Sequence, residues 1–189
     1  MASTKTETAS FPVTIYSDVI CPWCYVGKRR FERALDAPDM PQPVSISWRP
    51  FELNPDMPES GMDRAGYRAR KFGADKSRQL DAQMSETGRE VGISFAFDKM
   101  KRTPNTRLAH RLIWQAEREG TAAQNAVVDR LFIRYFEEGL DIGSRDVLLG
   151  IACECGLDAA RAKRALDDEA MASLSTWVVV GGFILAHLF

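Results

Sequence analysis

The sequence predicts an α/β protein in which one βαβ unit precedes a long block of helices. Apolar and polar residues alternate over 13–16 and again over 43–49, as in half-buried strands, and a helical pattern separates the two segments. Two strands joined in this way by a helix pair in parallel. From Met62 to about Leu166, helical patterns follow one another, divided by glycine and proline, and no convincing strand lies among them.

The first strand leads into a pair of cysteines, Cys21-Pro22-Trp23-Cys24, and then into the first helix. Amides and the dipole at a helix N-terminus stabilise a thiolate, so we expect the first cysteine to have a lowered pKa. The second cysteine lies one turn further on the same face and can reach back to the first. Proline suits the first helical position because no amide hydrogen is needed there, and the tryptophan should be partly exposed beside the sulfurs. This spacing predicts a redox-active dithiol.

A zinc site or an inert buried pair would also use two cysteines. A structural zinc needs four ligands, and the other candidates are His110, Cys153, Cys155 and His187, which form no second CxxC or HxxxH pattern. We therefore predict no metal. His110 lies in an apolar helical pattern with no acid partner visible, so we interpret it as a structural histidine. Cys153 and Cys155 would point to different faces of a helix, which favours a role as small packing residues.

The composition is that of an ordinary soluble protein. Of the 189 residues, 45% are apolar and 27% are charged, and the net charge is -1. This balance gives no electrostatic case for a nucleic acid or an anionic membrane as a partner. Residues 1–10 are polar and lack the pattern of a signal peptide, and four cysteines are too few for a disulfide-stapled secreted scaffold. We therefore expect a cytoplasmic protein with a disordered lead over 1–10.

Caps and turn residues divide the rest of the chain. The first helix should end near Leu35, and a turn-rich segment over 36–43 should lead to the second strand. A loop over 51–58 should lie near the cysteines, and 92–97 is interpreted as an extended crossing piece. Further helices are expected at 63–72, at 76–91, from Pro104 with Asn105 or Thr106 as cap, at 122–138, from Ser144, and from Asp158 to about Asp167.

Four segments together resemble the DsbA-like thioredoxin-fold proteins of the FrnE type. They read VTIYSDVICPWCYVGKRRFERAL, WRPFELNPDMP, PNTRLAHRLIWQAEREG and RYFEEGLDIGSRDVLLGIACECGLD, and the likeness runs from about Val13 to about Leu166. The resemblance implies a thioredoxin-like fold with a large all-helical domain inserted after the second strand. It implies a discontinuous thioredoxin-like domain over 11–60 and 170–189, and a helical insertion over 61–169.

The same resemblance implies a dithiol–disulfide oxidoreductase. In it Cys21 is the nucleophile, Cys24 resolves the mixed disulfide, and Pro22 and Trp23 contact the substrate. The partner would be a protein or small molecule that contains a disulfide or a thiol. No metal or bound cofactor is implied, although glutathione could serve as reductant or co-substrate.

The end of the chain departs from the family pattern. Members return from the insertion into a strand preceded by a cis-proline, whereas the last proline here is Pro104. We therefore expect the C-terminal sheet elements to be truncated or altered. The tail MASLSTWVVVGGFILAHLF could form a hairpin around Gly181-Gly182, or be an ill-packed remnant of a truncation or a frame change. Its apolar run is shorter than the ~20 residues of a membrane span, and an unpacked tail would favour a homodimer.

Two other functions stay open at this point. Hydroxychromene carboxylate isomerases and kappa-class glutathione transferases resemble the same architecture but carry a serine where this chain has Cys21. A glutathione-dependent isomerase or transferase is therefore one alternative, and a non-catalytic homologue that acts as an interaction module is the other. The presence of both cysteines favours the oxidoreductase.

Overall fold

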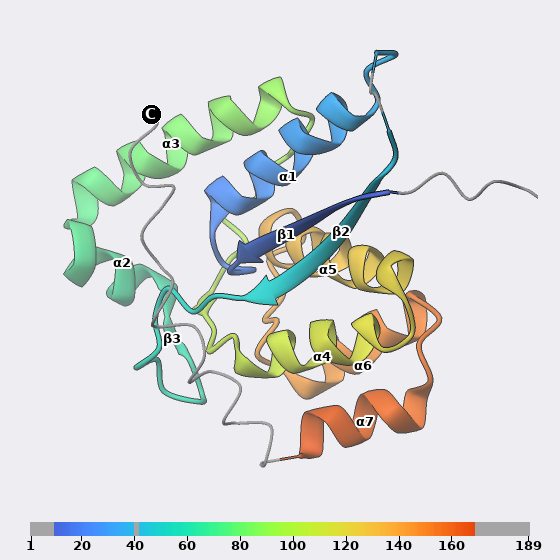
Figure 1. Ribbon diagram of the computed structural model, residues 1–189. Helices are drawn as coiled ribbons and strands as arrows, with labels where there is room; N and C mark the ends of the chain where they lie inside the picture. Colours follow the sequence, from blue (N-terminus) through green and yellow to red (C-terminus); the bar gives the residue numbers. More distant parts are fainter. Residues whose placement is uncertain (1–9, 40–41, 169–189) are drawn as a thin grey trace, which may run out of the picture.

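The computed structural model describes residues 10–39 and 42–168, and its first elements form the predicted βαβ unit (Figure 1). Strand β1 (Phe11–Ser17) is followed by helix α1 (Pro22–Leu35) and strand β2 (Val44–Pro50). The strands pair in parallel, from Phe11 opposite Val44 to Ser17 opposite Pro50. The carboxyl ends of both strands therefore lie side by side, close to the point where α1 begins.

The chain after β2 is mostly helical, as predicted. Its helices are α2 (Arg64–Phe72), α3 (Ala74–Glu90), α4 (Arg107–Glu117), α5 (Thr121–Phe136), α6 (Arg145–Glu154) and α7 (Ala159–Asp167). Figure 1 shows α1 and α3 on one side of the two strands and α4, α6 and α7 on the other. Helices α4 and α5 both contact β2. Residues 1–9 of the predicted lead and the predicted C-terminal sheet elements lie outside the described residues.

The predicted caps are present in part. The Asp158 carboxylate accepts a hydrogen bond from the backbone N–H of Arg161 at 2.8 Å, which confirms the cap of α7. At the start of α4 it is Asn105 whose side chain accepts from a backbone N–H, that of Arg107, at 3.0 Å. Ser144 stands at the N-cap position of α6, but its side chain makes no capping hydrogen bond.

One prediction for the helical block was wrong. Met62–Asp63 (β3) pairs antiparallel with Arg102–Thr103 (β4), so the block does contain a short ladder. Two residues are too few to show the alternation by which a strand is recognised in a sequence. The segment 92–97 between the helices has neither helical nor strand structure.

Part of the hydrophobic core lies where α1 meets α5. Tyr25 of α1 is fully buried and stacks on Phe132 of α5 with the ring centroids 4.9 Å apart and the planes within 7°. Phe136 continues this cluster, with its centroid 6.0 Å from that of Tyr25. Burying each of these rings stabilises the fold by about 1.5–3 kcal/mol. The core therefore fixes the first helix against the helices that follow β2.

A side chain of α5 covers the outer edge of β2. Gln124, which is fully buried, accepts a hydrogen bond from the backbone N–H of Trp48 at 2.9 Å and donates one to its carbonyl oxygen at 3.0 Å. The amide thus replaces a neighbouring strand at this position and leaves no unpaired backbone group. Within the described part of the chain, no helix is long and apolar enough to cross a membrane.

Candidate active site

The two motif cysteines lie at the first turn of α1. Cys21 is the residue before the helix, with φ -91° and ψ 111°, and Pro22 occupies the first helical position. The backbone N–H of Cys24 donates to the carbonyl oxygen of Cys21 at 3.1 Å, and that of Cys21 donates to the carbonyl oxygen of Asp18 at 3.0 Å. Both cysteines are free thiols that are partly exposed. Of the two, Cys24 packs against the hydrophobic core, so Cys21 is the outer sulfur.

A hydrogen bond between the two thiols controls their acidity. It lowers the pKa of Cys24 to about 6, and the Ser17 hydroxyl and the backbone N–H of Asp18 add to this effect against the opposing effect of burial. The same hydrogen bond, followed by burial, raises the pKa of Cys21. The expectation of a lowered pKa at Cys21 is thus corrected, because the thiol that donates to a neighbouring thiolate gives up its proton last. The pair loses its first proton near pH 6.

The predicted substrate-contacting residues differ in exposure. The Trp23 side chain is 48% exposed and the neighbouring Pro22 is partly buried. The loop after β2 approaches the same end of the sheet, as predicted, since the backbone N–H of Phe51 donates to the carbonyl oxygen of Ser17 at 3.1 Å. Leu53, in the same loop, is 46% exposed. Two large apolar side chains are thus exposed on segments adjoining the cysteine pair.

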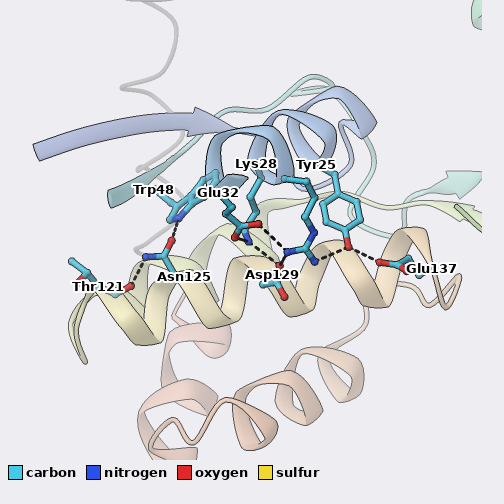
Figure 2. Close-up of polar contacts among 9 residues, drawn as sticks. Tyr25, Lys28, Glu32, Trp48, Thr121, Asn125, Asp129 and Glu137 are labelled. Carbon is cyan, nitrogen blue, oxygen red and sulfur yellow. Dashed lines mark hydrogen bonds and ion pairs between the residues drawn. The ribbon is translucent and has the colours of Figure 1, made fainter. Parts of the chain in front are cut away.

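Polar contacts hold α1 against α5 below the cysteines. Figure 2 shows Tyr25, Lys28 and Glu32 of α1 meeting Asp129 of α5 and Glu137, the residue that follows α5. The Lys28 ammonium pairs with Asp129 at 2.8 Å and also with Glu32, although its side chain is only 4% exposed. The Tyr25 hydroxyl donates to Glu137 at 2.5 Å. These contacts fix the rotation of α1 about its axis, and with it the direction of the two sulfurs.

Sequence reasoning missed the acid that lies beside the motif. Asp18 follows the first strand, and its side chain is completely buried. His110 was interpreted as lacking an acid partner, but its Nε2 atom lies 3.7 Å from Oδ1 of Asp18. The two residues are far apart in the sequence, so no local pattern could have paired them. An aspartate three residues before a cysteine motif is the one signal that the sequence offered.

The other cysteines stay apart from this site. Cys153 is exposed near the end of α6, and Cys155, its C-cap residue, is partly buried, which raises the pKa of the Cys155 thiol. Over residues 10–39 and 42–168, no cluster of three or more His, Cys, Asp or Glu side chains could hold a metal ion.

Comparisons with known proteins identify relatives of this chain and solved structures that resemble it. The chain is 32% identical over 155 residues to the uncharacterised protein YwbO of Bacillus subtilis, covering 82% of this chain and 71% of that protein. It resembles the crystal structure of a probable DsbA oxidoreductase from Streptomyces coelicolor, with a TM-score of 0.76, 27% identity, and coverage of 88% and 71% of the two chains. A 2-hydroxychromene-2-carboxylate isomerase shares the fold, with a TM-score of 0.65, 15% identity, and coverage of 88% and 76%.

A family match spans most of the chain. Residues 12–176 match the family described as the DSBA-like thioredoxin domain. This range contains β1 from its second residue, β2, the cysteine pair and helices α1 to α7. The α/β architecture with helices inserted after β2 is the one that the sequence predicted. With this match and the relative from Bacillus subtilis, the chain belongs to the DSBA-like thioredoxin domain family.

Proposed function

We propose that this protein is a thiol–disulfide oxidoreductase that uses Cys21 and Cys24 on disulfides of proteins or small molecules. The observation that carries the proposal is the pair of free thiols at the first turn of α1, where one thiol donates a hydrogen bond to the other sulfur and the first proton leaves near pH 6. At neutral pH such a pair carries one thiolate, which is the reactive form in disulfide exchange.

The reaction begins at the outer sulfur. The shared proton moves from Cys21 to Cys24 along their hydrogen bond, and the backbone N–H groups of Trp23 and Cys24 favour the resulting Cys21 thiolate. This thiolate attacks one sulfur of the substrate disulfide, so a mixed disulfide forms and the other substrate sulfur leaves as a thiolate that takes up a proton.

The inner cysteine completes the exchange. Cys24 loses its proton and attacks the sulfur of Cys21, and the second substrate sulfur leaves as a thiol. The substrate has then gained two electrons and two protons, and the protein holds a Cys21–Cys24 disulfide. Two molecules of a small thiol such as glutathione would reduce this disulfide again and become glutathione disulfide. We propose a reducing compartment such as the cytoplasm for this cycle, which cell fractionation with an antibody would test.

The second sulfur separates this function from the glutathione-dependent isomerase. An isomerase shares this fold, so the fold does not discriminate between the two activities. A resolving cysteine is needed only when a mixed disulfide must be released, and Cys24 lies within hydrogen-bonding reach of Cys21. Pro22 and the exposed Trp23 adjoin the outer sulfur, and we propose that they contact the substrate.

The proposal is tested by trapping the mixed disulfide. The reduced parent chain is mixed with glutathione disulfide, and protein–glutathione adducts are followed by intact-mass spectrometry. The Cys24→Ser variant should accumulate one adduct on Cys21, the Cys21→Ser variant should lose exchange at this site, and a Cys153→Ser/Cys155→Ser variant should behave like the parent.

The outcomes separate the alternatives. A folded parent that forms no Cys21–Cys24 disulfide with glutathione disulfide would overturn the oxidoreductase and leave the two alternatives. Activity that requires glutathione and survives in the Cys24→Ser variant would instead indicate the isomerase or transferase.

A further inference from the structure

A buried charge lies next to the cysteine pair and has no role in the exchange described so far. The Asp18 side chain is completely buried, and its two oxygens accept hydrogen bonds from the backbone N–H groups of Leu53 at 2.7 Å and Ile20 at 3.3 Å. Taking a carboxylate out of water is costly, and two backbone donors offset only part of that cost. A third group therefore has a reason to face this carboxylate.

That group is a histidine supplied by the inserted helices. His110 of α4 is 8% exposed, and its Nε2 atom lies 3.2 Å from the carbonyl oxygen of Phe51 and 3.7 Å from Oδ1 of Asp18. A carbonyl oxygen can only accept a hydrogen bond, so Nε2 carries the hydrogen in this contact. The N–H edge of the ring therefore faces the buried carboxylate.

Asp18 in turn acts on the inner sulfur. The negative charge of its carboxylate raises the pKa of Cys24, against the larger lowering by the hydrogen bonds from Cys21, Ser17 and the Asp18 backbone. The buried Ser17 hydroxyl makes no other hydrogen bond within the described structure, which leaves it able to donate to a Cys24 thiolate. The positive end of the His110 N–H dipole weakens the repulsion between Asp18 and that thiolate.

Other ionisable side chains lie near Asp18 and His110. Tyr135 of α5 is buried, and after burial the charge of Asp18 is among the causes that raise its pKa. Glu52, next to Phe51 in the chain, pairs with Arg107 of α4 at 3.3 Å. Among the ion pairs of the described residues, His110 is the one partner that faces Asp18.

We propose that His110 is a positioning residue of the redox site, which acts through Asp18 to set how readily the cysteine pair holds a thiolate and how oxidising its disulfide is. The inference rests on the redox function proposed above. It assigns to a helix of the insertion a direct influence on the chemistry at the start of α1. Stabilising the thiolate of the reduced pair makes the corresponding disulfide a stronger oxidant.

Two measurements on the full chain test this inference. The thiolate of the reduced protein is titrated by its absorbance at 240 nm, and the disulfide is equilibrated with glutathione buffers. His110→Ala should move the thiolate titration to higher pH and shift the glutathione equilibrium about tenfold toward the protein disulfide, a factor that corresponds to one pH unit. His110→Gln, which keeps a neutral donor, should lie between this variant and the parent, with a shift of at least twofold.

A double variant shows whether the effect passes through the carboxylate. Asp18→Asn removes the charge and should ease thiolate formation, and adding His110→Ala to it should cause no further shift. Thr14→Ala, at an exposed position of β1, is the matched control and should match the parent.

Different outcomes would overturn the inference and the proposed function on which it rests. If His110→Ala unfolds the protein, the His110→Gln variant decides, because a shift smaller than twofold in that variant would overturn the inference. An undiminished His110→Ala shift in the Asp18→Asn background would overturn it as well. A parent whose cysteines neither form a thiolate below pH 8 nor exchange with glutathione would instead overturn the proposed function.

Discussion

The shared proton of the cysteine pair predicts how the stability of the reduced protein depends on pH. An ordinary thiol has a pKa of 9.0, whereas that of Cys24 in the folded chain is about 6. Between these values the folded reduced protein holds one thiolate and the unfolded chain holds none, so folding releases about one proton. A lowered folded-state pKa adds stability that is fully present above pH 9 and is lost as the pH falls through 6.

The size of the change in unfolding free energy follows from the pH range between these two pKa values. One released proton changes the free energy of unfolding by about 1.4 kcal/mol per pH unit, which gives about 4 kcal/mol over three units. Partial exposure of the sulfur to water reduces this, and we expect about 2–4 kcal/mol. Cys21, whose pKa is raised, acts in the opposite direction only above pH 9. The oxidised protein has neither thiol and lacks the effect.

Urea denaturation of both redox states measures the prediction. The difference in unfolding free energy between the reduced and the oxidised protein should rise from pH 6 to pH 9, because all other ionisable groups occur in both forms and largely cancel. A Cys21→Ser/Cys24→Ser variant should show no such rise under reducing conditions. A difference that stays constant or falls with pH would refute the shared-proton argument.

Two further predictions concern the scaffold that holds the site. Asp129→Ala leaves the buried Lys28 ammonium without its partner on α5 and should cost about 1–3 kcal/mol, measured as a lower urea midpoint at constant slope; an unchanged midpoint would contradict it. Gly88→Ala would place a Cβ 2.5 Å from the Phe95 ring and should cost about 1–3 kcal/mol. The Cβ of Gly27→Ala meets no atom within 4 Å, so this variant should be neutral or stabilise α1 by up to about 1 kcal/mol in thermal unfolding. A greater loss of stability in Gly27→Ala than in Gly88→Ala would contradict the packing described for these two glycines.

The elements that the sequence predicted are those that local patterns determine. The first helix ends at Leu35, as its turn-rich sequel indicated, and β2 over Val44–Pro50 matches the alternation seen at 43–49. The periodicity of apolar residues reflects which face of a helix or strand is buried. This face can therefore be recognised in the sequence whichever segment covers it. The ladder between Met62–Asp63 and Arg102–Thr103 was not predicted, because it forms where two distant segments pair over only two residues.

The site was predictable to the extent that its residues are neighbours in the chain. Cys21 and Cys24 could be placed at a helix start because the strand, the proline and the helix surround them in the sequence. Asp18 and His110 could not be paired, since their contact exists only after α4 packs beside β2. Lys28 is a similar case, because a lysine suggests an exposed face of a helix, whereas its ion pair with the distant Asp129 helps to offset the cost of burying it.

The helices that follow β2 are therefore part of the support of the candidate site. Gln124 supplies the hydrogen bonds that a strand would give to Trp48, Asp129 holds the helix that carries the cysteines, and His110 faces the acid beside them. Each contact joins an element of the βαβ unit to α4 or α5. A displacement of these helices would change the edge of the sheet, the orientation of α1 and the charge near Cys24 together. Sequence changes in α4 and α5 should thus tune the acidity of the cysteine pair without altering the motif itself.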